Sequence, residues 1–178
     1  MNFLALDFET ASSQPHSACS IALTMVRENK IVGEFSTLIK PDTPFSPHTI
    51  NVHHITPDMV QDAPTFAQVW PVIKQYFNPN SLIVAHNAAF DNRVLSACLA
   101  YSGFTQPTYL TLDTVRTSRA CYKKLPNHKL NTVADYLNIS LNHHDALEDS
   151  RACALILIHQ ATHFDLSLLK PFVSYYPK

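Results

Sequence analysis

The chain has 178 residues and a formal net charge of −1 at pH 7, and 46% of its residues are hydrophobic. This length suits one domain with a proper core, and the charge excludes a strongly basic nucleic-acid-binding tail but not a local basic patch. The four cysteines lie far apart without a Cys-x-x-Cys pair, which predicts reduced thiols and neither a disulfide framework nor a zinc site. Because no signal peptide or membrane-spanning run is evident, we expect a cytoplasmic protein with no membrane partner.

The chain opens with an apolar run at residues 1–10 that two acids interrupt at a spacing of two. This composition predicts a β-strand that is buried on both faces. Residues i and i+2 of a strand point to the same face, so Asp7 and Glu9 would present two carboxylates side by side at the end of the strand. Such a pair either binds a hard cation such as Mg2+ or lies at a strand end that meets water. This stretch alone favours neither interpretation.

The following segments predict a mixed α/β fold. Residues 20–27 and 31–39 read as a hairpin that forms an antiparallel meander with the opening strand. Helices are predicted at residues 62–77, 88–101, 114–122, 129–137 and 145–163, short strands at 81–85 and 109–112, and loops at 11–17 and 40–47. We therefore expect a five-stranded sheet, a meander followed by parallel strands, with helices on both faces. Residues 1–163 would form one domain, and residues 164–178 a C-terminal tail packed on it.

A third acid, Asp91, follows the predicted strand at 81–85. Asn87 could cap the helix that begins beside it, which would place Asp91 in the first helical turn. Ligand sites of α/β sheets gather beyond the carboxyl ends of strands. An acid in a first turn also stabilises its helix through the macrodipole, and position alone does not separate the two roles.

The last acidic segment lies at the start of the long helix predicted at 145–163. Asp145 and Glu148 have the spacing of a capping box, so we do not assign Glu148 a catalytic role. His144 precedes the cap and Asp149 lies about one turn inside the helix. Taken alone, His144 could be a surface loop residue and Asp149 another first-turn acid.

The three acidic segments together resemble one known pattern. The chain resembles the DEDDh group of 3′–5′ exonucleases, the family of the epsilon proofreading subunit of DNA polymerase III, over roughly residues 2–161. The matching motifs are Asp7-Phe8-Glu9-Thr10, His86-Asn87-Ala88-Ala89-Phe90-Asp91 and His144-Asp145-Ala146-Leu147-Glu148-Asp149. Each motif alone is a weak match, whereas three in this order and spacing are specific.

The resemblance implies a ribonuclease H-like core and an enzyme that releases nucleoside 5′-monophosphates from single-stranded or frayed 3′ ends of DNA. It implies that Asp7, Glu9, Asp91 and Asp149 bind two divalent ions, Mg2+ or Mn2+. It also implies that His144 is the general base, a task that suits an imidazole with an ordinary pKa near ~6.5. These five residues are the predicted catalytic set.

Four further residues are predicted to contact the substrate. In the family, the residue after the first-motif glutamate, here Thr10, helps to hold the 3′ terminus. His53 and Phe90 are predicted base or sugar contacts, although a loop histidine and a core phenylalanine are the simpler interpretations. Lys129 belongs to a segment at residues 114–134 without acids, which is either a phosphate-facing patch or a solvated helix face. The basic residues of this segment are Arg116, Arg119, Lys123, Lys124 and Lys129.

The sequence departs from the family at two places and leaves rival functions open. Ala11-Ser12 stands where many members have Thr-Gly, and His53-His54-Ile55 stands where many have His-Gly-Ile. An exoribonuclease of the same superfamily would use the same catalytic residues. The sequence is also compatible with a catalytically silent module beside a DNA polymerase, or with a ribonuclease H-like endonuclease.

Overall fold

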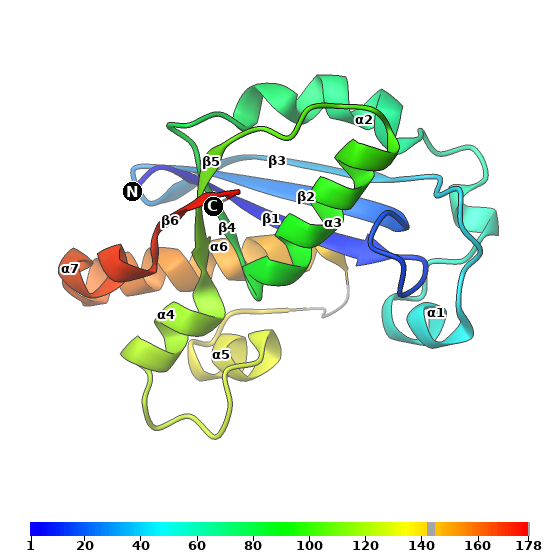
Figure 1. Cartoon of the computed structure of the whole chain (residues 1–178). Coiled ribbons are helices and arrows are strands. Elements are labelled where there is room, and N and C mark those ends of the chain that lie inside the picture. The colour runs from blue at the N-terminus through cyan, green and yellow to red at the C-terminus, as the bar shows by residue number, and fades with distance from the viewer. Residues whose placement is uncertain (142–144, 178) are drawn as a thin grey trace.

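A computed structural model describes residues 1–141 and 145–177. A single six-stranded sheet forms its centre, in the order β3-β2-β1-β4-β5-β6 (Figure 1). β1 pairs antiparallel with β2, and β2 with β3, whereas β1–β4 and β4–β5 are parallel pairs. The predicted meander followed by parallel strands is therefore confirmed. The strands are β1 (Phe3–Thr10), β2 (Ala18–Arg27), β3 (Lys30–Leu38), β4 (Leu82–Ala85), β5 (Tyr109–Asp113) and β6 (Ser174–Tyr176).

The predicted number of five strands is wrong by one, because the segment at 164–178 contributes β6. This strand pairs antiparallel with β5, with Tyr109 opposite Tyr176. Three residues are too few to show the alternation by which a strand is recognised in a sequence. The end of the chain thereby covers the β5 edge of the sheet, which would otherwise expose unpaired backbone groups.

Helices cover both faces of the sheet, as expected. On one face, α2 and α3 pack with Leu4, Leu6 and Phe8 of β1, and on the other α6 packs with Phe3 and Ala5. Figure 1 shows α6 running along the face opposite α2. The helices are α1 (Pro47–His53), α2 (Phe66–Ile73), α3 (Ala88–Tyr101), α4 (Thr114–Cys121), α5 (Leu130–Tyr136), α6 (Ala146–His163) and α7 (Leu166–Leu169), with 3-10 turns at Asp58–Val60, Lys74–Tyr76 and Lys170–Phe172. Within the described residues, every helix is too short or too polar to span a membrane.

Two helices differ from the prediction. α1 was missed because it has only seven residues and follows a proline-rich stretch, although Ser46 caps it and Pro47 occupies its first position. α2 begins at Phe66 and not near residue 62, because Thr65 and Gln68 form a capping box there. The chain leaves α2 through a 3-10 turn at Lys74–Tyr76.

The β6 contacts yield a stability prediction. The ring of Tyr176 packs on Tyr109 with centroids 5.6 Å apart, and its hydroxyl hydrogen-bonds Ser96 Oγ at 2.8 Å and donates to the Asn92 carbonyl at 3.2 Å. Tyr176→Ala should lower the free energy of unfolding by about 2 kcal/mol, measured by urea denaturation. The matched variant Tyr175→Ala, on a 55% exposed neighbour, should stay within about 0.5 kcal/mol of wild type. Equal losses would contradict this packing.

Candidate metal centre

Three carboxylates converge at the end of β1. The alternation of the strand points Asp7 and Glu9 to the α6 face of the sheet, the face on which Phe3 and Ala5 pack. Asp149 lies in the first turn of α6 and is buried there. One carboxylate oxygen from each of Asp7, Glu9 and Asp149 lies within 4.8 Å of the other two. The structure therefore brings together two acids from the first motif and one from the third.

Asp91 adds a fourth carboxylate from α3. It is 2% exposed in the first turn of the helix, and its Oδ1 accepts the N–H of Phe8 at 3.1 Å. Phe8 lies between Asp7 and Glu9, so this hydrogen bond fastens Asp91 to the strand that carries the other acids. The proposed capping role of Asn87 is wrong in detail, because Asn87 has φ 79° and its side chain makes no cap bond. Its N–H instead donates to Asp113 Oδ1 at 3.1 Å.

The electrostatics of the cluster are unfavourable to four ionised carboxylates. Burial, together with the charges of Asp91 and Asp149, raises the pKa of Asp7 well above its ordinary value. The pKa of Glu9 rises to about 8, first through burial and then through Asp149 and Asp91. Burial also raises the pKa of Asp91 to about 8, against the lowering effect of the Phe8 hydrogen bond. A hard divalent cation is the partner that carboxylate oxygens at this spacing suit.

The first turn of α6, which carries Asp149, is held by a helix cap and an ion pair. The carboxylate of Asp145 accepts the N–H groups of Leu147 and Glu148 at 2.9 and 3.2 Å, which confirms it as the helix cap. Glu148 forms an ion pair with Arg151, which also binds Glu34 on β3. Glu148 is thus occupied by a surface ion pair. His144, the predicted general base, lies outside the described residues.

His53 supports the backbone beside the cluster. Its Nδ1 accepts the N–H of Ile55 at 3.0 Å, so the proton of the neutral ring lies on Nε2, which donates to the Thr10 carbonyl at 3.1 Å. Burial lowers the pKa of His53, in keeping with the neutral form. Both ring nitrogens already have hydrogen-bond partners within the chain. A contact between His53 and a base or sugar stays a prediction, and it would involve the carbon atoms of the ring.

His54 explains one departure from the family pattern. It ends α1 in the left-handed conformation, with φ 61° and ψ 7°. Glycine adopts this conformation without a steric penalty, whereas another residue costs roughly 1 kcal/mol. The position where many members have glycine therefore keeps the glycine-like backbone in this chain.

The other predicted substrate contacts lie around the cluster. Thr10 and Phe90 line one cavity of about 420 Å³ together with Arg93, a residue that the sequence interpretation missed. Arg93 follows Asp91 in α3 by two residues, which is the only signal that could have singled it out. Lys129 is exposed and immediately precedes α5, and the neighbouring His128 carbonyl accepts a hydrogen bond from His86 Nε2 at 2.9 Å.

The proposed basic patch is spread over several environments. The Arg116 guanidinium lies 5.3 Å from the ring centroid of Phe172, a cation–π contact. Lys123 and Lys124 line a cavity of about 560 Å³ with Tyr136 and Phe164. These contacts account for part of the patch by packing within the chain, and a phosphate-binding role stays a prediction.

The mixed sheet with carboxylates gathered at the end of its central strand defines a ribonuclease H-like domain. The family model described as exonuclease (RNase_T) matches residues 4–157, and the chain belongs to this family of nuclease hydrolases. The resemblance to the DEDDh exonucleases is therefore confirmed at the level of the family.

Curated relatives are much longer than this chain. The chain is 34% identical over 159 residues to a PolC-type DNA polymerase III of Caldanaerobacter subterraneus subsp. tengcongensis and 36% identical over 158 residues to that of Clostridium perfringens. These matches cover 88% and 87% of the chain but only 11% of each relative. The similarity is thus to one part of a large polymerase.

Solved structures share the fold over almost the whole chain. Exonuclease X in complex with 5′ overhanging duplex DNA is 25% identical, with a TM-score of 0.71 and 96% and 98% of the two chains covered. E. coli Exonuclease I in complex with a dA16 oligonucleotide has a TM-score of 0.83 at 20% identity, and 42% of it is covered. The second likeness establishes the fold alone.

The raised carboxylate pKa values yield a prediction for the metal-free protein. The pKa values of Glu9 and Asp91 rise on folding from 4.5 and 3.8 to about 8. Between about pH 4 and about pH 8 the folded state then binds more protons than the unfolded state, so stability should fall as the pH rises. Urea denaturation in EDTA at several pH values measures this. A free energy of unfolding that rises from pH 5 to pH 8 would contradict the prediction.

Divalent ions should reverse the loss. At pH 8, Mg2+ or Mn2+ should raise the thermal midpoint, because an ion that binds only the folded state stabilises it. Asp7→Asn should raise the midpoint in EDTA by removing one repelling charge, and should weaken the response to the ions. Asp62→Asn, on an exposed acid outside the cluster, serves as the control and should change neither property.

His53 yields a separate prediction. His53→Ala leaves the Thr10 carbonyl and the Ile55 N–H without these partners, and should lower the free energy of unfolding by about 1–3 kcal/mol. His48→Ala removes an exposed histidine from the same helix and should cost no more than about 0.5 kcal/mol. If His53→Ala lowers the free energy of unfolding no more than His48→Ala does, measured by urea denaturation, the buried imidazole does not stabilise the strand end.

Proposed function

We propose that this chain is a metal-dependent 3′–5′ exonuclease that hydrolyses the terminal phosphodiester bond of a DNA strand and releases nucleoside 5′-monophosphates. The observation that carries the proposal is the convergence of the Asp7, Glu9 and Asp149 carboxylates at the end of the central strand. Membership of the exonuclease family supports the same conclusion. Burial of Asp91 against the Phe8 N–H supplies the fourth acid of the set that the family resemblance implies.

Asp7, Glu9, Asp91 and Asp149 would hold two Mg2+ or Mn2+ ions. When bound, such ions stabilise the charge on the attacking and leaving oxygens of a displacement at phosphorus. The donor set fits them, because it consists of carboxylate oxygens and because its charges repel one another. The chain itself holds these acids in place through the pairing of β1, the packing of α6 and the Asp91–Phe8 hydrogen bond.

His144 would act as the general base that removes a proton from the attacking water. The family resemblance of the third motif, in which His144 precedes Asp145, supports this role. Besides burial and the nearer carboxylates, the charge of Asp145 contributes to the raised pKa values of Asp7 and Glu9. Asp145, the cap of α6, thus acts electrostatically on the cluster.

DNA is the proposed polymer, and its single-stranded or frayed 3′ end the proposed site of attack. The similar Exonuclease X and Exonuclease I structures hold an overhanging duplex and a dA16 oligonucleotide, which supports this choice. RNA is the alternative, because the same acids would serve it and only the shape around the 2′-hydroxyl distinguishes the two. A polymerase partner is a further proposal, supported by the PolC-type relatives.

Variants of the cluster test the mechanism. Asp7→Ala should abolish hydrolysis by removing a metal ligand, and His144→Ala should slow it about 10²–10⁴-fold by removing the base. Asp62→Ala, the exposed control, should retain wild-type activity. The assay follows a 5′-labelled single-stranded oligonucleotide in Mg2+ or Mn2+, in which 3′–5′ cleavage gives a ladder of shortening labelled products. Wild-type rates in both Asp7→Ala and His144→Ala would refute the mechanism.

The form of the substrate tests the rest of the proposal. A circular single-stranded DNA should stay intact under conditions that degrade the same sequence in linear form, because the enzyme needs an end. Matched DNA and RNA oligonucleotides incubated with Mn2+ should show faster loss of the DNA. Cleavage of the circle would indicate an endonuclease, and loss of RNA while DNA persists would replace DNA by RNA as the substrate.

A further inference from the structure

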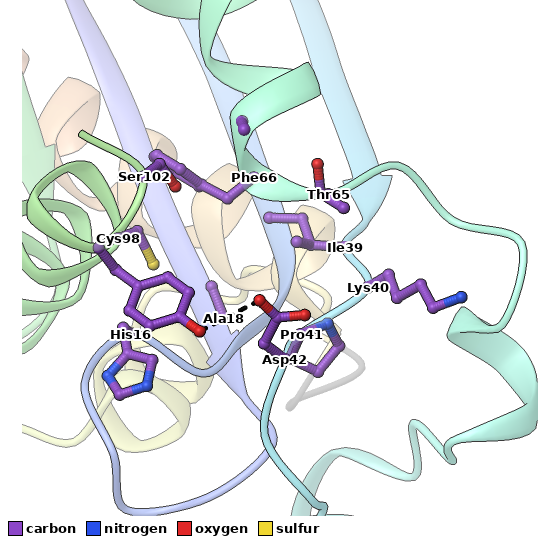
Figure 2. Close-up of a pocket in the computed structure, with 12 residues that line it drawn as sticks. His16, Ala18, Ile39, Lys40, Pro41, Asp42, Thr65, Phe66, Cys98 and Ser102 are labelled. Carbon is purple, nitrogen blue, oxygen red and sulfur yellow. Dashed lines mark hydrogen bonds between the residues drawn. The ribbon is translucent and has the colours of Figure 1, made fainter. Parts of the chain in front are cut away.

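Two neighbouring cavities follow α3 away from the carboxylates. The first, of about 420 Å³, is lined by Thr10, Phe90 and Arg93. The second, of about 260 Å³, has His16 in its lining (Figure 2). Tyr101, the last residue of α3, also lines it. The loop at residues 11–17 contributes to the walls of both cavities, so the two cavities are adjacent along α3.

The second cavity carries an exposed aromatic pair. The rings of His16 and Tyr101 are stacked with centroids 4.6 Å apart and an interplanar angle of 13°, although Tyr101 is 59% exposed. The Tyr101 hydroxyl donates to Asp42 Oδ2 at 3.1 Å, which fixes the orientation of the ring. Tyr101 thus presents an exposed aromatic ring, stacked on His16, at the opposite end of α3 from Asp91.

The loop that carries His16 is well fixed. The N–H of Ala11 donates to the Ser17 carbonyl at 2.8 Å, and Ser17 Oγ donates to the Gln14 carbonyl at 2.6 Å. Ser17 is fully buried, so the loop is anchored at its base. An ordered aromatic platform loses little conformational entropy when a ligand stacks on it.

The charges along this path are unevenly placed. Arg93 is exposed and lies between the two ends of the path, where its guanidinium can bind phosphate. Lys40 extends away from His16 in Figure 2, and its Nζ donates to the Gln61 carbonyl at 2.9 Å. Lys40 and Asp42 both line this cavity and their charges offset, so the far end has no excess positive charge and suits a base better than a phosphate.

We propose that the strand upstream of the terminal nucleotide follows α3, with a phosphate at Arg93 and a base stacked on the His16–Tyr101 pair. The ligand is a single-stranded polynucleotide, and the inference rests on the proposed nuclease function. From Phe90 to Tyr101 the helix rises roughly 16 Å. At about 3.4 Å per phosphate in a stacked strand, this path accommodates about four or five nucleotides. Stacking on aromatic rings makes such binding tolerant of sequence.

Oligonucleotide length tests the aromatic pair. Fluorescence anisotropy in EDTA measures the affinity for labelled dT10, and kinetics in Mg2+ give kcat/KM for dT10 and dT3. Tyr101→Ala should weaken dT10 binding at least about fivefold, and should lower kcat/KM for dT10 more than for dT3. Tyr175→Ala, which removes a similarly exposed tyrosine on β6, should leave the binding and the ratio of the two rates at their wild-type values.

Salt dependence tests Arg93. Arg93→Gln should reduce the slope of log K against log salt concentration for dT10 by about 0.7, the value expected for one phosphate contact on a single strand. Arg27→Gln, on an exposed arginine at the far end of β2, should leave the slope unchanged. Equal slopes for the two variants would place the phosphate elsewhere.

The outcomes separate this inference from the proposed function. If wild type binds dT10 but hydrolyses no oligonucleotide with either ion, the nuclease proposal fails. If wild type hydrolyses dT10 while Tyr101→Ala and Tyr175→Ala show the same affinity and the same length dependence, the path along α3 is refuted. Thermal midpoints of the variants establish that each protein is folded.

Discussion

Repulsion among carboxylates at the end of a buried strand is the constraint around which this domain is built. β1 is sandwiched between helices on both faces, so the acids that close it leave water as they enter the structure. Without a cation, burial and mutual charge raise the pKa values of these acids. Packing and strand pairing in the rest of the fold must therefore offset the repulsion among these carboxylates.

The sheet order provides this stability. β1 is paired on both sides, antiparallel to the hairpin of β2 and β3 and parallel to β4, so it cannot move to relieve the repulsion. Asp149 arrives on α6, whose opposite faces pack against the sheet and against α5. Asp91 is tied to the backbone of the strand itself. Rigid elements, and not loops, thus position every described acid of the cluster.

The sequence predicted those parts that depend on local periodicity. The period of two along a strand correctly placed Asp7 and Glu9 on one face, and helical patterns located α3 and α6 closely. That Asp91 and Asp149 meet this pair followed only from the family resemblance, because no local rule relates residues so far apart in the chain. His53 shows the same limit, since its hydrogen bonds to Thr10 and Ile55 depend on a helix, α1, that was not predicted. β6 and the left-handed Asn87 depend on tertiary pairing that a short segment does not encode by itself.

The position of Asp149 on α6 has a consequence for the order in which the protein is made. A nascent chain leaves the ribosome N-terminus first, and its domain folds as a unit once enough of it has emerged. Asp7 and Glu9 emerge at the start, but their partner acid comes only with the helix that also completes the packing beneath β1. The carboxylate cluster therefore cannot form on a chain that stops short of α6. Until α6 has left the ribosome, these acids are apart and the candidate centre is not assembled.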